Sequence, residues 1–434
     1  MAEKQIDVLV IGSGGREHAI IWKLLQSPRC GQIYFAPGNG IVGSLGDKVT
    51  NVPIKATAID ELIRFAKEKD VDLTIVGPED PLILGIVNVF RREGLKIFGP
   101  TKAAARLEGS KAFMKRLCWK NGIPTAPGEI FDNLEAAMAN VKERGAANIV
   151  IKVDGPALGK GAFLPENEDE AANILRRIFV HREFGDSGNL VIIEDRMFGQ
   201  EVSMMSICCG DDNLALPPSQ DHKRIGDGDT GLNTGGMGAY SPLPWLSQEA
   251  IEQIQRTIID RLIIAMEKEG CPYSGLLYPG IIWTEDGPKL LEVNVRFGDP
   301  ETQVVLPLVN SDLLEILLAC AEGDLSGIKL ELSHGFCVGV VMASGGYPGT
   351  YNKGFPISGI EQAEKIPGIT VFQAGTALGV GELTTNGGRV LCVTALEDTA
   401  EKAITEAYRA VGCIHFTGKT FRHDIAHQAK AVSR

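Results

Sequence analysis

The sequence predicts a multidomain protein that combines α/β and α+β architecture. Its 434 residues exceed the length that one hydrophobic core usually organises, because single cores stop growing near ~250–300 residues. Short apolar strands alternate with helices in the first quarter of the chain, which is typical of a parallel sheet. Later segments show the alternation and Gly-rich turns of antiparallel strands. We therefore expect a parallel amino-terminal domain, a larger central domain and a small α+β domain.

Residues 1–107 carry the parallel pattern. Each expected strand ends in a Gly or Pro turn, namely GSGG, PGNG, GPED or GPT. Ligands of parallel sheets bind beyond the carboxyl ends of the strands, where these turns fall. The expected strands are Ile6–Ile11, Ile33–Ala36, Leu73–Val76 and Ile97–Phe98, with a helix at Ala58–Lys69.

The central part, residues 108–325, begins with a helix and a strand and continues as a mostly antiparallel sheet. Gly122 and Pro124 should end the first helix. We expect residues 221–238, which are polar and rich in glycine, to form a long loop without regular structure. Residues 326–434 should form the small α+β domain. The expected elements are helices Lys111–Asn121 and Glu168–Val180 and strands Ile149–Val153, Cys337–Met342 and Arg389–Ala395.

Composition excludes several functional classes. The formal net charge of -12 argues against binding to nucleic acid. No apolar run approaches the ~18 residues that cross a bilayer, and the first residues lack the pattern of a signal peptide. We therefore expect a cytoplasmic protein without a membrane partner. The nine cysteines form no CxxC pair, which favours buried free thiols over disulfides or a zinc site.

The first Gly-rich motif is Gly12-Ser13-Gly14-Gly15, between a strand and a helix. Glycines there let backbone N–H groups approach a phosphate at the helix N-terminus. A dinucleotide fingerprint needs a further glycine where this chain has Glu17. Another phosphate-bearing ligand, dinucleotide binding and a plain tight turn all remain open.

The second motif runs from Lys152 to Gly161 and is not a Walker A loop, because Lys160 is followed by glycine. A strand-borne lysine with a glycine flap would hold a triphosphate in another way; a Gly-rich hairpin with solvated lysines is the alternative. A third segment, residues 191–203, joins two strands through a connector. Its backbone could pair with an adenine and Glu201 with ribose hydroxyls, although a surface hairpin fits equally well.

The strongest motif is the strand at residues 291–297. Alternation places Leu291, Val293, Val295 and Phe297 on a buried face and Glu292, Asn294 and Arg296 on the other. A carboxylate and an amide oxygen two residues apart are hard ligands suited to Mg²⁺. Arg296 could bind a carboxylate or phosphate. A half-exposed strand with a polar face is the alternative, but Asp299 and Glu301 add carboxylates that it does not require.

In this order the motifs resemble an ATP-grasp ligase, and more specifically the glycinamide ribonucleotide synthetase family. The resemblance rests on GSGGREH, APGN, GPE, SKAF, QDHKR, NTGGMGAY and NVRFGDPE, which fall between residues 11 and 302, and on SGGYPG, AGT and NGGRVL beyond them. It implies a parallel amino-terminal (pre-ATP-grasp) domain, an ATP-grasp domain in which residues 122–192 form a mobile lid, and a small carboxyl-terminal domain.

The resemblance also implies a reaction and its residues. ATP, glycine and 5-phosphoribosylamine would be the substrates, Mg²⁺ or Mn²⁺ the cofactor, and neighbouring pathway enzymes transient partners. Metal ligands would be Glu292 and Asn294. Catalytic residues would be Arg296, Lys223 and Asp221. ATP would contact Lys111, Lys152, Gly159, Lys160, Gly161, Glu194, Asp195, Met197 and Glu201. The remaining substrates would contact Gly12, Gly14, Gly15, Arg224, Asn233 and Arg296.

The chemistry agrees with this resemblance. An amine does not displace oxide from a carboxylate, whereas phosphorylation supplies a good leaving group. Phosphoryl transfer is promoted by positioning and cations, not by a protein nucleophile. Three other classes remain as alternatives: a different ATP-grasp ligase or carboxylase, a nucleotide-linked oxidoreductase, and a non-enzymatic ATP sensor. A carboxylase would share the Glu292–Asn294 pair without QDHKR, and a sensor would not need Arg296 on the same face.

Overall fold

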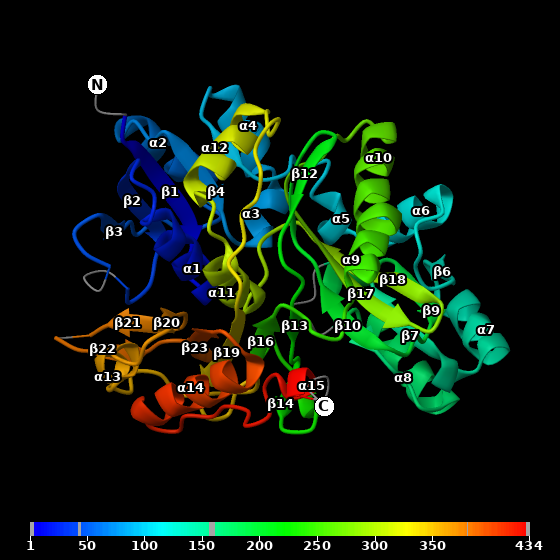
Figure 1. The fold of residues 1–434 in the computed structure, drawn as a ribbon. Coiled ribbons are helices and arrows are strands. Elements are labelled where there is room, and N and C mark those ends of the chain that lie inside the picture. Colours follow the sequence, from blue (N-terminus) through cyan, green and yellow to red (C-terminus); the bar gives the residue numbers. More distant parts are fainter. Residues whose placement is uncertain (1–3, 42–44, 156–160, 380, 431–434) are drawn as a thin grey trace.

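The computed structural model describes residues 4–41, 45–155, 161–379 and 381–430 (Figure 1). Its first part is a five-stranded parallel sheet in the order β3-β2-β1-β4-β5. All four residues of β4 are buried, as expected of a parallel strand covered on both faces. The elements are β1 (Ile6–Gly12), α1 (Gly15–Leu24), β2 (Cys30–Pro37), β3 (Val49–Asn51), α2 (Ile59–Glu68), β4 (Leu73–Val76), α3 (Glu79–Leu84), α4 (Ile86–Arg92) and β5 (Ile97–Phe98).

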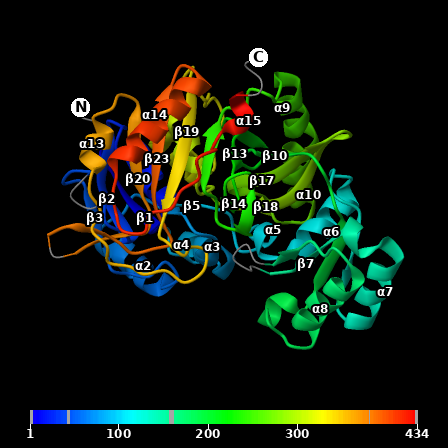
Figure 2. The same cartoon turned by 90° about the horizontal axis from the view of Figure 1, so that it is seen from below.

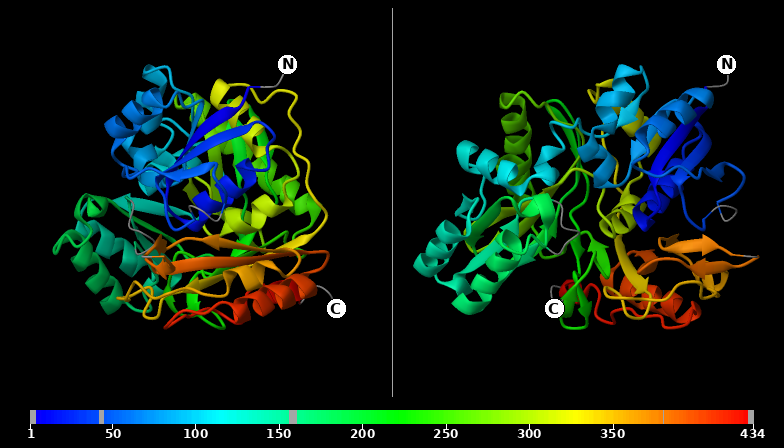
Figure 3. Two further views of the ribbon diagram at one scale, coloured as in Figure 1. Left: turned by 90° about the vertical axis from the view of Figure 1, so that its left-hand side faces the viewer. Right: turned by 180° about the vertical axis from the view of Figure 1, so that it is seen from behind.

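A second sheet, β6-β9-β7-β8, projects to one side with its own apolar core (Figure 3). The helix before it, α6 (Lys111–Asn121), has the predicted bounds. Ser110 caps it by accepting from the N–H of Phe113 at 3.0 Å, and Gly122 ends it with φ of +62°, as helix caps commonly do. The sheet consists of β6 (Gly128–Phe131), β7 (Ile149–Val153), β8 (Ala162–Phe163) and β9 (Val191–Asp195), with α7 (Leu134–Arg144) and α8 (Glu168–Phe179).

The central body is an antiparallel sheet in the order β10-β17-β11-β12, with β18 beside β17. Its register shifts where β18 passes Gly280. This bulge makes Leu290 the fully buried residue and leaves Leu291 half-buried, so the expected burial of Leu291 is wrong, while Val293, Val295 and Phe297 are buried as predicted. The elements are α5 (Arg106–Gly109), β10 (Gln200–Ser203), β11 (Ser206–Cys209), β12 (Asp212–Ala215), α9 (Gln248–Ile254), α10 (Asp260–Lys268), β17 (Ser274–Thr284), β18 (Gly287–Asn294), α11 (Glu301–Val305) and α12 (Leu313–Glu322).

A third sheet, β13-β16-β19-β23-β20, joins the central and carboxyl-terminal parts (Figure 2). The segment 221–238 is not an irregular loop, because β14 and β15 form a hairpin within it. Gly228 and Asp229 turn it with positive φ, the turn chemistry of hairpins. The elements are β13 (Gln220–Asp221), β14 (Arg224–Gly226), β15 (Thr230–Asn233), β16 (Gly238–Ser241), β19 (Phe336–Ala343), α13 (Ile360–Glu364), β20 (Ile369–Gln373), β21 (Thr376–Leu378), β22 (Leu383–Thr385), β23 (Arg389–Glu397), α14 (Ala400–Cys413) and α15 (His427–Lys430).

Two buried histidines attach other parts of the chain to the carboxyl-terminal part. Nδ1 of His18 accepts from the N–H of Gln373 at 2.7 Å, and Nε2 of His222 lies 3.4 Å from the N–H of Ala426. Burial lowers the pKa of His18 to about 3. Burial, together with the charge of Arg422, lowers the pKa of His222 to about 4. Both rings are therefore neutral in the folded protein above those values.

We expect acid to weaken the fold through these two rings. Between pH ~6 and ~4 the unfolded chain binds protons that the folded chain excludes, so the free energy of unfolding should fall by about 1.4 kcal/mol per pH unit for each histidine. Urea unfolding at pH 7, 6 and 5 measures the slope. His18→Asn keeps an acceptor and should reduce the slope, while His181→Asn on the exposed surface should leave it unchanged. Equal slopes in all three proteins would contradict the assignment.

Candidate active site

The predicted site residues lie on elements that face one another across the junction of the three parts (Figure 3). Lys111 begins α6, Lys152 lies on β7 and Glu194 on β9. Nζ of Lys152 donates to the carbonyl of Leu291 on β18 at 3.3 Å. This contact joins the projecting sheet to the strand that carries Glu292, and the β-bulge leaves that carbonyl free for it.

A buried ionic triad underlies this junction. Glu194 Oε1 lies 2.5 Å from Nζ of Lys152, and its Oε2 lies 2.5 Å from Nζ of Lys115. Lys115 and Glu194 are 0% and 1% exposed. Burial raises the pKa of Glu194, but the two lysines outweigh it and the net pKa is lowered. Glu194 thus bridges two lysines in this structure.

Lys115 was not predicted as a site residue, although its spacing from Lys111 indicates it. It follows Lys111 by four residues on α6, and residues four apart share one helix face. Nζ of Lys111 donates to the carbonyl of Gly155 at 3.2 Å, and burial lowers the pKa of Lys111 despite the nearby charge of Glu292. One face of α6 thus directs two lysines toward the site.

Glu292 and Asn294 occupy neighbouring outward positions of β18. Among the described residues, the Glu292 carboxylate has no direct hydrogen bond or ion pair. Burial raises its pKa, yet the charges of Lys223, Lys152, Lys111 and Arg296 lower it overall. Oδ1 of Asn294 accepts from Nη2 of Arg296 at 3.1 Å and keeps a second lone pair. An ionised carboxylate without a direct partner in the described part of the chain, beside an amide oxygen, fits a divalent cation.

The described residues contain no group of three or more His, Cys, Asp or Glu side chains arranged to hold a metal ion. Two protein oxygens are nevertheless sufficient for Mg²⁺, which takes its other ligands from nucleotide phosphates and water. The donor set is therefore more consistent with a metal that arrives with nucleotide than with a permanent metal centre.

Arg296 lies between two carboxylates that the sequence analysis did not select. Its Nε donates to Glu79 at 3.1 Å, and its Nη2 lies 3.4 Å from Glu108. Although burial lowers the pKa of Arg296, Glu108 and Glu79 raise it overall. Burial raises the pKa of Glu108, whose Oε2 also accepts from the N–H of Val295 at 2.8 Å. These contacts fix the guanidinium beside the Glu292 face.

Asp221 and Lys223 form a second charged group with Glu201. Nζ of Lys223 donates to Glu201 and lies 3.6 Å from Oδ1 of Asp221. That oxygen is buried and has no hydrogen-bond partner among the residues that the structure describes. Burial raises the pKa of Asp221 to about 7, against the opposing charge of Lys223. Lys223 has a pKa well above its usual value, because Asp221, Glu201 and Glu292 outweigh its burial.

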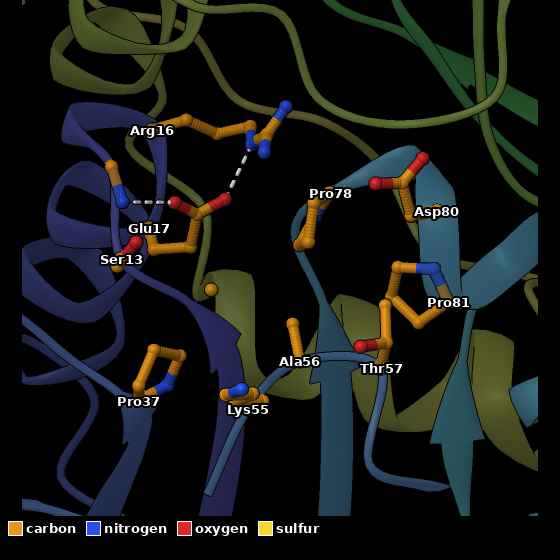
Figure 4. A pocket seen from close by; sticks show the side chains of 12 residues that line it. Ser13, Arg16, Glu17, Pro37, Lys55, Ala56, Thr57, Pro78, Asp80 and Pro81 are labelled. Atoms are coloured by element: carbon orange, nitrogen blue, oxygen red, sulfur yellow. Dashed lines mark hydrogen bonds and ion pairs between the residues drawn. The ribbon is translucent and has the colours of Figure 1, made fainter. Parts of the chain in front are cut away.

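The Gly12–Gly15 turn borders a cavity of about 450 Å³ at the carboxyl edge of the parallel sheet (Figure 4). Gly14 and Gly15 begin α1, but the N–H of Gly14 donates to Oε2 of Glu17 at 2.6 Å. Glu17 also pairs with Arg16 at 2.5 Å. Glu17, which stands where the dinucleotide fingerprint has glycine, therefore accepts a hydrogen bond from the Gly14 N–H. In that fingerprint the same N–H would be available to a phosphate.

Lys55 and Asp80 line opposite sides of this cavity (Figure 4). Neither was selected from the sequence, because Lys55 lies outside any motif and Asp80 was noted only as part of the GPED turn. Lys55 is exposed and, in the described part of the chain, has no direct partner. Burial and the charge of Glu79 raise the pKa of Asp80. Arg16 and Glu17 also line the cavity but are paired with each other, so Lys55 and Asp80 are the cation and the carboxylate that it offers to a ligand.

The other predicted residues lie at the end of β9, in the β9–β10 connector, in the β14–β15 hairpin and just before β8. Asp195 pairs with Arg144. Met197 is half-buried in the β9–β10 connector. Arg224 and Asn233 face each other across the hairpin, where Nη1 of Arg224 donates to the carbonyl of Gly231 at 2.7 Å. The carbonyl of Gly161 accepts from the N–H of Val153 at 2.9 Å. Gly159 and Lys160 lie outside the described residues.

Three family models match the chain in succession. They are the phosphoribosylglycinamide synthetase N domain at residues 6–108, its ATP-grasp (A) domain at 109–302 and its C domain at 337–428. The chain belongs to the phosphoribosylglycinamide synthetase family. The predicted three-part architecture, with a parallel amino-terminal domain and an ATP-grasp domain, is confirmed by these matches and by the sheets described above.

Relatives of this family include single enzymes and fusions. The phosphoribosylamine–glycine ligase of Vibrio cholerae is 46% identical over 98% of this chain and 99% of its own length. The bifunctional purine biosynthetic protein ADE1 of Schizosaccharomyces pombe is 47% identical over 98% of this chain, but the match covers 54% of that protein. The chain therefore spans about half the length of the fused relatives that it matches.

One solved structure supports the same family, and another shares the fold. A phosphoribosylamine–glycine ligase from Thermotoga maritima has a TM-score of 0.84 and 34% identity, covering 97% of this chain and all of that one. A biotin carboxylase from Campylobacter jejuni has a TM-score of 0.74 at 15% identity, covering 99% and 95%. The second likeness shows the fold alone. Enzymes of the ATP-grasp family use ATP with a divalent metal.

Proposed function

We propose that this protein ligates glycine to 5-phosphoribosylamine, giving glycinamide ribonucleotide, ADP and phosphate. The observation that carries the proposal is the ionised Glu292, whose carboxylate has no direct partner among the described residues and whose pKa is lowered overall by Lys223, Lys152, Lys111 and Arg296. Such a concentration of cations around one free carboxylate suits the binding and transfer of a phosphoryl group. The relatives from Vibrio cholerae and Thermotoga maritima are both named phosphoribosylamine–glycine ligases.

In this proposal the cations surround the triphosphate. Lys111 and Lys152 reach it from α6 and β7, while Met197 in the β9–β10 connector and Glu201 on β10 lie along the nucleoside. Mg²⁺, held by Glu292 and Asn294, would neutralise phosphate charge when bound. Gly159, Lys160 and Gly161 would cover the phosphates, and closure of the lid would keep water from the reactive intermediate.

The reaction then proceeds in two steps. An oxygen of the glycine carboxylate attacks the terminal phosphorus and ADP leaves, which produces glycyl-phosphate. The amine nitrogen of phosphoribosylamine attacks the acyl carbon, phosphate leaves and the nitrogen loses a proton. Arg296 would orient the carboxylate and then the acyl-phosphate, because its planar fork matches both groups. Lys223 would stabilise the transferring phosphoryl group beside Asp221.

The cavity next to Gly12 and Gly14 is proposed to take the phosphorylated ribose. Its volume of about 450 Å³ accommodates a sugar phosphate, and Lys55 supplies a cation. Arg224 and Asn233 would approach the same substrate from the hairpin. In the described part of the chain no helix is long and apolar enough to cross a membrane. We propose action in the cytoplasm, with transient contact to neighbouring purine enzymes of the kind fused in ADE1.

The position of the isotope in labelled products tests the reaction path. With heavy oxygen in the glycine carboxylate, one labelled atom should appear in inorganic phosphate, as measured by mass spectrometry. Attack at the α-phosphorus would instead place the label in AMP and release pyrophosphate. Labelled glycine incubated with the protein but without ATP serves as the control for exchange of its oxygen with water. Label in AMP, or pyrophosphate formed in step with the amide, would refute the proposed acyl-phosphate.

A further inference from the structure

The carboxyl-terminal part contacts the β14–β15 hairpin through one buried arginine, Arg422. The Arg422 side chain is 0% exposed. Its Nη1 donates to the carbonyl of Arg224 at 3.2 Å and to Oδ1 of Asp229 at 2.6 Å. Its Nε and Nη2 donate to the two oxygens of Asp424, each at 2.8 Å. One guanidinium thus joins the first residue of β14 to the turn of the hairpin.

Further contacts strengthen this attachment. Oδ2 of Asp424 accepts from the N–H of Gly228 at 2.8 Å, and the N–H of His423 donates to Oδ1 of Asp227 at 2.7 Å. The carbonyl of Arg422 accepts from Tyr408 on α14 at 2.8 Å. The segment that carries Arg422 is therefore anchored on one side to a long helix and on the other to the hairpin. Figure 1 shows β14 beside the carboxyl-terminal helix α15.

The hairpin needs such an external anchor. Its ladder consists of two residue pairs with an irregularity between them, and isolated two-stranded hairpins are marginal in water. All four residues of β15 are exposed. No apolar face of β15 is thus buried to hold it, and the ionic contacts of Arg422 supply the constraint.

The hairpin also adjoins the charged group of the site. Lys223 immediately precedes β14, and its carbonyl accepts from the N–H of Thr234 at 2.8 Å, just after β15. A hairpin that shifts would therefore move the backbone of Lys223 relative to Asp221. Sub-ångström placement matters for phosphoryl transfer, because the protein acts there mainly by positioning.

We propose that Arg422 is a positioning residue that fixes the hairpin, and through it Lys223, for phosphoryl transfer. This rests on the proposed function. An arginine is required because its planar fork serves a carbonyl and two carboxylates at once, while lysine offers a single compact charge. Arg422 acts on turnover through the backbone of Arg224 and does not touch the nucleotide.

The test compares Arg422→Lys and Asp229→Asn with the surface control Arg409→Lys on α14. We expect Arg422→Lys to lower kcat at least 30-fold and Asp229→Asn about 3- to 10-fold, with KM for ATP changed less than threefold. Hydrogen exchange of the amides in residues 224–233 should quicken at least tenfold in Arg422→Lys. Asp229 is 52% exposed, so Asp229→Asn should fold. If Arg422→Lys does not fold, the kcat and hydrogen exchange of Asp229→Asn test the proposal.

The outcomes separate this proposal from the proposed function. The proposal for Arg422 is overturned if amide hydrogen exchange in residues 224–233 is unchanged in Arg422→Lys. It is also overturned if that exchange is faster while kcat is unchanged in both variants. A rise in KM for ATP that equals the whole loss of kcat/KM also overturns it, because positioning of Lys223 acts on turnover. If the parent protein forms no amide, the proposed function fails, and the exchange measurement alone decides whether Arg422 fixes the hairpin.

Discussion

Glu292→Gln should lower kcat about a thousandfold while the protein stays folded, a loss of about 4 kcal/mol in transition-state stabilisation. Glutamine keeps the shape of the side chain but removes the charge that faces Lys223, Lys152 and Lys111. It also removes the stronger of the two proposed metal ligands. The loss should persist at saturating ATP, because the charge acts on phosphoryl transfer as well as on binding.

Initial rates across a range of Mg²⁺ and Mn²⁺ concentrations measure this effect, and circular dichroism verifies the fold. Glu285→Gln is the matched control, since Glu285 is an exposed residue in the turn between β17 and β18. It should retain the parent rate. Near-normal turnover of Glu292→Gln at limiting metal would show that this carboxylate is not a ligand.

Glu194→Leu should destabilise the fold by about 3–5 kcal/mol, the usual effect of leaving a buried charge without its partner. Leucine leaves Lys115 and Lys152 facing each other with no carboxylate between them. The pKa of Glu194 is lowered in the folded protein, so its stabilisation is present above its ordinary value of 4.5 and is lost as pH falls. Relative to the parent protein, the variant should therefore lose more free energy of unfolding at pH 7 than at pH 4.

Chemical denaturation at pH 7 and pH 4 measures the difference. The double variant Glu194→Leu/Lys115→Met should recover part of the loss, because it removes one of the two unpaired charges. Glu183→Leu is the surface control, since its pair with Arg177 is about half exposed and such pairs contribute little. A Glu194→Leu protein as stable as the parent would refute the role of the triad.

Local patterns were sufficient to predict most of the regular elements. α6 and β7 have the predicted bounds because their signals all act within a few residues: a capping serine and a left-handed glycine for α6, and four β-branched residues around Lys152 for β7. The alternation that separates Glu292 and Asn294 from Val293 and Val295 is equally local. The alternation rule fails at Leu291 because the β-bulge arises from the pairing of β18 with β17. The sequence of residues 291–297 alone does not indicate that pairing.

The remaining parts of the site depend on distant pairs. Glu79 meets Arg296 from 217 residues away. Glu108 meets the same strand at Val295 from 187 residues away, and no spacing rule connects these residues. Lys115 could have been found from its i+4 relation to Lys111. The hairpin at residues 224–233 was missed because Gly and Asp suit irregular loops as well as tight turns, and the carboxyl-terminal anchor that distinguishes the two is far along the chain.

Because Arg422 holds the β14–β15 hairpin, the site cannot be complete until Arg422 has been synthesised. Arg422 follows Arg224 by 198 residues, so at about 5–20 residues per second it is synthesised roughly 10–40 s later. During that interval β14 and β15 lack their anchor, and β16 lacks its neighbour β19. A nascent chain can thus fold its parallel sheet early, but Lys223 reaches its final place only when the carboxyl-terminal part arrives.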